Sequence, residues 1–217
     1  MGRSYDRARM STRAERAETK RAERRDDIAA QLVGPVEALL ADGRSFAELT
    51  VDEIIERSDV PRSTFYYNFR EKAELLVAIS ETATREIVGA SYALYGLGPD
   101  VTREAFGRQV RRTVETWVPH VPLMNALAET ASVSPRVREQ FAAGWEAARE
   151  GVAEHIRTGQ ANGTLRAELD PVRHAAWLTW MAERGMSQLV HPAGPKERRA
   201  LSDALADIVW TVLYGTS

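Results

Sequence analysis

Residues 50–72 have the sequence TVDEIIERSDVPRSTFYYNFREK, which is typical of two short helices joined by a tight turn. Thr50 is a candidate N-cap, and Glu53 completes a capping box that satisfies otherwise unpaired backbone amides. Pro61 suits the start of the second helix, because its φ is already helical and its missing N–H is not needed there. The stretch therefore predicts a helix-turn-helix, a motif that places its second helix in the DNA major groove.

The second helix of this motif carries more donors and flat rings than burial requires. Phe65 is its single apolar anchor, and we expect both Phe65 and Phe69 in the core. One alternative for the tyrosines is that one ring packs against the preceding helix and only its hydroxyl reaches out. The candidate DNA contacts are Arg62 and Thr64 for base edges, Ser63, Tyr66 and Tyr67 for phosphates, and Thr50 and Lys72 for phosphates at helix N-termini.

Residues 50–76 have the sequence TVDEIIERSDVPRSTFYYNFREKAELL, and this run resembles the DNA-binding signature of TetR-type repressors. In that family an aromatic residue, a short break and Lys-x-x-Leu-Leu follow the motif, as Phe69, Lys72, Leu75 and Leu76 do here. The resemblance covers residues 27–80. It implies that the DNA-facing residues include Arg62, Ser63, Thr64, Tyr66, Tyr67, Asn68 and Lys72.

The last stretch of the chain carries a second, looser resemblance. Residues 181–215 have the sequence MAERGMSQLVHPAGPKERRALSDALADIVWTVLYG, which is similar to the end of the ethionamide-type regulators within that family. The resemblance implies an inducer cavity in the C-terminal part and a four-helix bundle formed by the last two helices of two subunits.

The composition of the 217 residues is that of an ordinary globular protein, with 44% hydrophobic and 28% charged residues. There is no cysteine, so disulfide and thiolate chemistry are excluded. No apolar run approaches the roughly 20 residues that span a bilayer, and no signal peptide is evident. We expect a cytoplasmic protein without membrane contact.

Positive charge is concentrated before the helix-turn-helix. Residues 1–25 hold nine Lys or Arg against four acids, whereas residues 26–72 hold five against ten. We expect residues 1–24 to form a basic, flexible tail. The tail could lie along the phosphate backbone or in a minor groove, or it could be a solvated segment that frays or extends the first helix.

The chain is predicted to be all-α, because no alternating strand pattern persists and the turns coincide with Gly or Pro. A helix-turn-helix domain of three helices over residues 25–72 is expected to join a larger ligand-binding and dimerisation domain over residues 73–217. Gly34-Pro35 predicts a kink or a late start in the first helix. About nine helices are expected, over residues 25–42, the two in the motif, and 72–91, 102–117, 120–131, 135–161, 171–190 and 196–214.

All five tryptophans lie in the C-terminal two thirds of the chain. With nearby Phe and Met they could line an apolar tunnel for a small hydrophobic ligand, or form an ordinary bundle core. Thr179 and Glu183 are candidate polar groups of such a tunnel, although Glu183 and Arg184 could equally form a structural ion pair. The candidate ligand contacts are Phe106, Trp117, Met124, Phe141, Trp145, Thr179, Trp180 and Glu183.

The helix expected at 196–214 is apolar over much of its circumference, with a stripe at Leu201, Leu205, Ile208 and Val212. Such a helix needs cover on two sides, which a two-fold dimer supplies, as would the centre of a monomer. A dimer would present two recognition helices about 34–36 Å apart to a palindrome.

Enzyme signatures are absent from the sequence. It contains no G-x-S-x-G, H-E-x-x-H, Walker loop or G-x-G-x-x-G, and its four histidines lack metal-ligand spacing. We expect no cofactor, no metal and no catalytic residues. The sequence thus predicts a homodimeric regulator, a repressor released from a palindromic double-stranded DNA operator by a small hydrophobic effector. The alternative is an all-helical small-molecule-binding protein or enzyme in which the helix-turn-helix is a packing motif.

Overall fold

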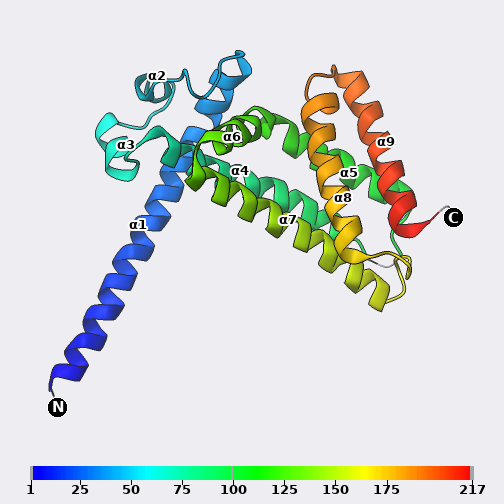
Figure 1. Cartoon of the computed structure of the whole chain (residues 1–217), viewed down its shortest axis with the longest axis horizontal. Coiled ribbons are helices and arrows are strands. Elements are labelled where there is room, and N and C mark those ends of the chain that lie inside the picture. The colour runs from blue at the N-terminus through cyan, green and yellow to red at the C-terminus, as the bar shows by residue number, and fades with distance from the viewer. Residues whose placement is uncertain (1, 99, 216–217) are drawn as a thin grey trace. The chain divides into compact units, whose positions relative to one another are not determined.

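The computed structural model describes residues 2–98 and 100–215, with side chains for all of these except residues 2–14 and 95. Over this part of the chain the protein is all-α, without strands, which confirms the predicted fold class (Figure 1). The nine α-helices of the described residues are α1 (Gly2–Ala41), α2 (Val51–Glu56), α3 (Arg62–Asn68), α4 (Lys72–Tyr95), α5 (Arg103–Trp117), α6 (Val121–Val133), α7 (Pro135–Ala161), α8 (Pro171–Gly185) and α9 (Pro195–Tyr214). A short 3-10 helix, η1 (Val118–His120), precedes α6, and a π-helix, η2 (Met186–Val190), follows α8.

The chain divides into two compact units, Met1–Thr82 and Ala83–Ser217, and the boundary lies within α4. In the first unit α1, α2 and α3 pack against one another. Leu32, Val36, Ile54 and Phe65 are completely buried there. The spacing of Leu32 and Val36 places both on one face of α1, as the sequence pattern predicted.

The first helix is longer than expected, and it begins at Gly2 instead of near residue 25. Residues 14–25 are rich in Ala, Glu and Arg, which favour helix wherever packing does not decide. Figure 1 shows this N-terminal part of α1 extending away from α2 and α3 as a single rod. The helix continues through Pro35, so the expected late start is wrong. Leu32 and Val36, buried on either side, hold the turns around Pro35 together.

In the second unit α7 packs along both α6 and α8, while α5 packs along α9. One core cluster joins α5, η2 and α9 around Phe106, Met186 and Trp210. A second cluster surrounds Ile156 and Leu165. The helix expected over residues 171–190 is interrupted, because its last turn adopts the wider π form.

A close approach limits side-chain size near the end of α7. A Cβ on Gly159 would overlap the side chain of Leu165, which is itself buried. Gly163 closes the turn between them with a φ of 75°, a conformation that other residues rarely adopt. By contrast, Gly144 in the same helix has open space around its Cα.

Gly159→Ala should therefore lower the free energy of unfolding by about 1–3 kcal/mol, because Leu165 has to move within a packed core. The measurement is urea denaturation followed by circular dichroism. Gly144→Ala is the matched control, and it should raise the free energy of unfolding by up to about 1 kcal/mol through helix propensity. Equal effects from the two substitutions would contradict this account of the α7–Leu165 contact.

Candidate DNA-binding and ligand-binding sites

Two buried phenylalanines fix the recognition helix α3 to the first unit. Phe65 and Phe69 are completely buried and their ring centroids lie 5.5 Å apart, which confirms that both belong to the core. The opposite face of α3 is exposed, including 48% of Tyr66 and 66% of Tyr67. Arg62 and Ser63 are exposed on the same short helix. One helix thus combines an apolar anchor with a polar, aromatic outer face.

Both tyrosine side chains expose more than a hydroxyl group, unlike the alternative in which one ring packs against α1. The Tyr66 ring packs edge-on against Phe65 at 5.3 Å, with the Arg62 guanidinium 5.5 Å from its centroid. The Tyr67 ring lies 5.9 Å from the Arg21 guanidinium of α1. Cations of α1 and α3 therefore flank the aromatic rings that face outward, an arrangement suited to a phosphate backbone.

Arg62 also forms an exposed ion pair with Asp52 of α2. The hydrogen bond to Asp52 raises the pKa of the Arg62 guanidinium above its ordinary value. Arg62 is hence charged and held over the outer face of the motif. A phosphate or guanine bound by Arg62 would have to replace the Asp52 carboxylate.

The predicted capping box at the start of α2 is present. The Thr50 hydroxyl accepts a hydrogen bond from the Glu53 amide at 3.2 Å, and a Glu53 carboxylate oxygen accepts one from the Thr50 amide at 2.7 Å. Arg44 donates to the other Glu53 oxygen at 2.6 Å. Hydrogen bonds from Arg44 and then Thr50 lower the pKa of Glu53 to about 2. The Thr50 hydroxyl is engaged in this cap. What favours a phosphate contact by Thr50 is therefore its position at the N-terminus of α2.

Lys72, predicted to contact a phosphate, also has partners within the first unit. Its Nζ donates to the carbonyl oxygens of Ala47 and Leu49, at 2.8 Å and 2.6 Å, and lies 5.1 Å from the Phe46 ring. Burial lowers the pKa of Lys72, an effect that Glu53 partly opposes. The ammonium ties the start of α4 to the segment before α2, so Lys72 positions the motif.

Asn68 and Thr64 are likewise less open than the other candidates. The Asn68 side-chain amide donates to the Thr64 carbonyl at 2.7 Å and so supports the last turn of α3. Both residues are only partly exposed. Spacing alone could not reveal these internal partners, because Lys72 and Asn68 have the same donors whether they face a phosphate or a carbonyl.

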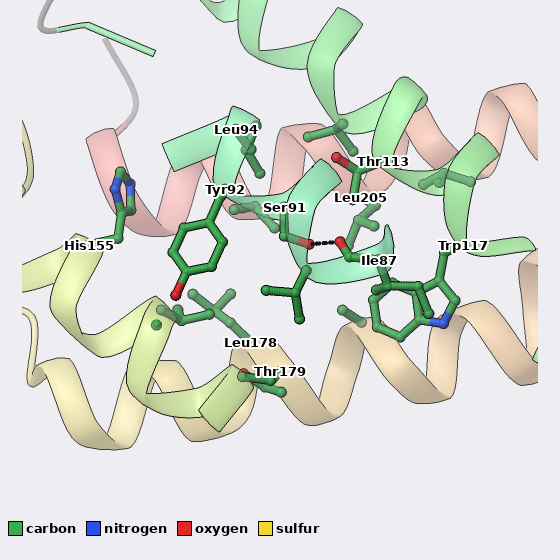
Figure 2. Close-up of a pocket in the computed structure, with 18 of the residues that line it drawn as sticks. Ile87, Ser91, Tyr92, Leu94, Thr113, Trp117, His155, Leu178, Thr179 and Leu205 are labelled. Atoms are coloured by element: carbon green, nitrogen blue, oxygen red, sulfur yellow. Dashed lines mark hydrogen bonds between the residues drawn. The ribbon is translucent and has the colours of Figure 1, made fainter. Parts of the chain in front are cut away.

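The second unit contains a cavity of about 160 Å³. It lies among α4, α5, α7, α8 and α9, and its walls are mostly apolar (Figure 2). Four candidate ligand contacts line this cavity: Phe106, Trp117, Trp145 and Thr179. Sequence reasoning missed the wall from α4, which contributes Ile87, Ser91 and Tyr92, because it treated that helix as a connection between domains.

The polar groups of the cavity are few. Ser91 donates to the Ile87 carbonyl at 3.0 Å (Figure 2). Thr113 donates to the Ala90 carbonyl at 3.1 Å. Thr179 is buried, and its hydroxyl has no hydrogen-bond partner among the residues that the structure describes. Burial lowers the pKa of His155, which favours the neutral form of its imidazole. The cavity thus offers an apolar surface with one unsatisfied hydroxyl, which suits an uncharged ligand.

The other four candidates lie outside this cavity. Phe141, Trp180 and Glu183 line a separate outer pocket of about 340 Å³. Met124 lines neither the cavity nor the outer pocket. Thr179, Ala182 and Met186 share one face of the helical segment, whereas Trp180 and Glu183 begin the neighbouring face. Each residue turns about 100° around a helix, so adjacent positions serve different pockets.

In residues 2–98 and 100–215, no group of three or more His, Cys, Asp or Glu could hold a metal ion. No helix in this part of the chain has the length and apolar character needed to cross a membrane.

A helix-turn-helix with an exposed polar face, followed by a larger helical unit with an apolar cavity, defines a helical DNA-binding transcriptional regulator. Comparisons with known families agree. The family described as "Bacterial regulatory proteins, tetR family" matches residues 39–79, and "Transcriptional regulator EthR, C-terminal domain" matches residues 106–215. The chain belongs to the TetR family of transcriptional regulators.

Solved structures share this fold. The TetR-family regulator PfmR from Thermus thermophilus is 20% identical, with a TM-score of 0.65 over 86% of this chain and 99% of its own. A TetR-family regulator from Rhodococcus sp. is 22% identical, with a TM-score of 0.63 over 87% and 98%. GusR of Salmonella enterica is 15% identical, with a TM-score of 0.67 over 85% and 94%. No curated protein matches the sequence.

The contacts of Lys72 and Arg62 predict different outcomes when each is truncated. Lys72→Met should lower the free energy of unfolding by roughly 1–2 kcal/mol, because two carbonyls lose a charged donor. Arg62→Ala should leave this free energy nearly unchanged, because its ion pair is exposed. Arg62→Ala should nevertheless weaken operator binding by about tenfold or more.

Thermal denaturation and gel-shift titration of the same preparations separate the two roles. Lys72→Met could instead leave stability unchanged and reduce the salt dependence of DNA binding. That result would support a phosphate contact by Lys72 and refute its positioning role.

Proposed function

We propose that this DNA-binding regulator is a homodimeric repressor that leaves a palindromic operator when a small hydrophobic effector enters its cavity. The observation that carries the proposal is the outer face of α3, where Tyr66 and Tyr67 expose their rings on a helix anchored by Phe65. A helix-turn-helix used only for packing would bury this face. The exposed rings therefore favour DNA binding over the alternative of a ligand-binding protein with an internal motif.

Apolar surface on α8 and α9 supports the homodimer. Trp177 is 79% exposed and Trp180 53% exposed on α8, and Ile208 is 48% exposed on α9. Together with Met181 and Val212 they line a shallow apolar groove between the two helices. α9 buries its other face, which carries Ala206 and Trp210. Contiguous exposed apolar surface of this kind marks an interaction site, and a two-fold contact through it covers both helices.

Helix α4 supports a route from the cavity to the DNA-binding motif. It begins at Lys72, whose ammonium is bonded to the segment before α2, and its later residues Ile87 and Ser91 line the cavity. A ligand that prefers one orientation of this wall shifts the population toward that orientation. We infer that the effector favours a tilt of α4 that changes the separation of the two α3 helices. The coupling requires different ligand affinities in the two states.

Selection from random duplex DNA tests the proposed function. The protein should enrich a palindrome with half-sites one helical turn apart, and its affinity should fall about a thousandfold or more between about 50 and about 200 mM salt. Gel-shift titration measures both properties. Failure to enrich any sequence would reject the repressor and favour the packing role of the motif.

Light scattering and the gel-shift titration together test the dimer. Trp177→Glu places a charge on the exposed apolar surface, so it should yield a monomer by light scattering and lose tight binding to the full palindrome. Val133→Glu alters an equally exposed apolar residue, 81% accessible at the end of α6, and should remain a dimer. If both variants remain dimers, the contact between subunits lies elsewhere.

Filling the cavity should weaken ligand binding without affecting the motif. Thr179→Leu adds bulk and removes the unsatisfied hydroxyl, so it should weaken binding of benzyl alcohol, used as an uncharged probe, by about tenfold or more. Isothermal titration measures this affinity. Thr158→Leu, an exposed site on α7, is the matched control. Equal binding by both variants would show that the probe does not occupy the cavity, and apo DNA affinity should be unchanged in each.

A further inference from the structure

The outer pocket beside α8 has its own chemistry. It is bordered by α6, α7, α8 and the π-helix η2, and it shares no lining residue with the cavity around Thr179. Its volume of about 340 Å³ falls within the range of about 300–1,000 Å³ typical of ligand pockets. Its lining residues include Asn125, Phe141, Trp180, Glu183, Ser187 and Gln188.

Glu183 brings an incompletely satisfied carboxylate to this pocket. Its Oε2 atom is buried, and no group in the described part of the chain donates a hydrogen bond to it. The Arg184 Nε atom lies 3.8 Å from Oε2, too far for a hydrogen bond, and the Arg184 side chain is mostly exposed. Burial raises the pKa of the Glu183 carboxyl, and Arg184 only partly opposes this effect. A mostly buried carboxylate with one unsatisfied oxygen is costly, so a cation beside the exposed part of the Glu183 side chain would stabilise it.

Aromatic rings form one side of the same pocket. Trp180 stacks on Trp145 of α7, with centroids 5.6 Å apart and an interplanar angle of 2°. Phe141 meets the same Trp145 ring edge-on at 6.0 Å. Trp145 thus holds Trp180 and Phe141 in place between the inner cavity and the outer pocket. Electron-rich ring faces next to a carboxylate are the surroundings that attract an organic cation.

The π-helix supplies the polar rim. π-helices are rare and occur frequently at functional sites. Here η2 carries Ser187 and Gln188 to the pocket. Ser187 donates to the Asn125 side-chain oxygen of α6 at 3.0 Å, and Gln188 donates to the Ser187 hydroxyl at 3.3 Å. This chain of hydrogen bonds orders several acceptor oxygens at the rim.

We propose that this outer pocket is a second ligand site, which binds a small organic ammonium ion carried on an apolar or aromatic body. The ammonium pairs with the Glu183 carboxylate, which lines the pocket, and the body lies against the Trp180 and Phe141 rings. The site is distinct from the cavity around Thr179, which has no carboxylate among its lining residues. Two alternatives are that Glu183 binds a neutral donor, or that it contacts a side chain of a second subunit. The experiment distinguishes each of them from a cation site.

The probes are 2-phenylethylammonium and its uncharged analogue 2-phenylethanol, titrated calorimetrically into the full chain and into Thr179→Leu, which fills the other cavity. The ammonium should bind Thr179→Leu about tenfold or more tightly than the alcohol does. Adding Glu183→Gln, which keeps the shape and removes the charge, should abolish this preference. Phe141→Leu should weaken the ammonium about threefold or more. Glu129→Gln, an exposed carboxylate of the same pocket, is the matched control and should change the affinity less than about twofold.

Three results would overturn the proposal. Equal affinities for the two probes, or binding of neither, would exclude a cation site. An unchanged ammonium affinity in Glu183→Gln would show that Glu183 does not bind the ammonium ion. A changed oligomeric state of Glu183→Gln by light scattering would make Glu183 a contact between subunits. None of these measurements involves DNA, so failure of the repressor hypothesis would leave their outcome intact.

Discussion

Burial of Phe65 and Phe69 is the interaction on which the DNA-binding unit depends. A helix as short as α3 is unstable by itself, because few hydrogen bonds offset the cost of nucleation. Two rings in the core hold it from one side, so the rest of its surface is free to carry polar and aromatic groups. The Lys72 ammonium adds a second attachment by bonding the carbonyls of Ala47 and Leu49. Together these contacts allow a short helix to present an exposed face without unfolding.

A similar division of faces explains the second unit. Helix α8 directs Thr179 toward the inner cavity and Glu183 toward the outer pocket, while Trp177 faces outward. The stacked Trp145 and Trp180 rings lie between the two pockets. One helix therefore serves a ligand cavity, a second pocket and an exposed apolar surface. Each role follows from the direction in which a side chain leaves the helix axis.

Much of the fold could be predicted because helix signals are local. The capping box at Thr50 and Glu53 identified the start of α2, and prolines marked the starts of α7 and α8. The burial of Phe65 also followed from the pattern of its neighbours. The start of α1 could not be predicted in this way, since the charged segment before residue 25 lacks an apolar stripe. The π turn at residues 186–190 was equally invisible, because its sequence is compatible with an ordinary helix.

The sequence by itself determined the helical class, the helix-turn-helix and the apolar anchor of α3, because capping, periodicity and proline geometry act between residues close along the chain. Tertiary structure decided which partner each polar group found. Only the fold showed that Lys72 bonds carbonyls more than twenty residues away, that α4 lines the cavity, and that Thr179 and Glu183 face different pockets. Donor and acceptor chemistry is the same for any partner, so the packing of distant segments selects among them.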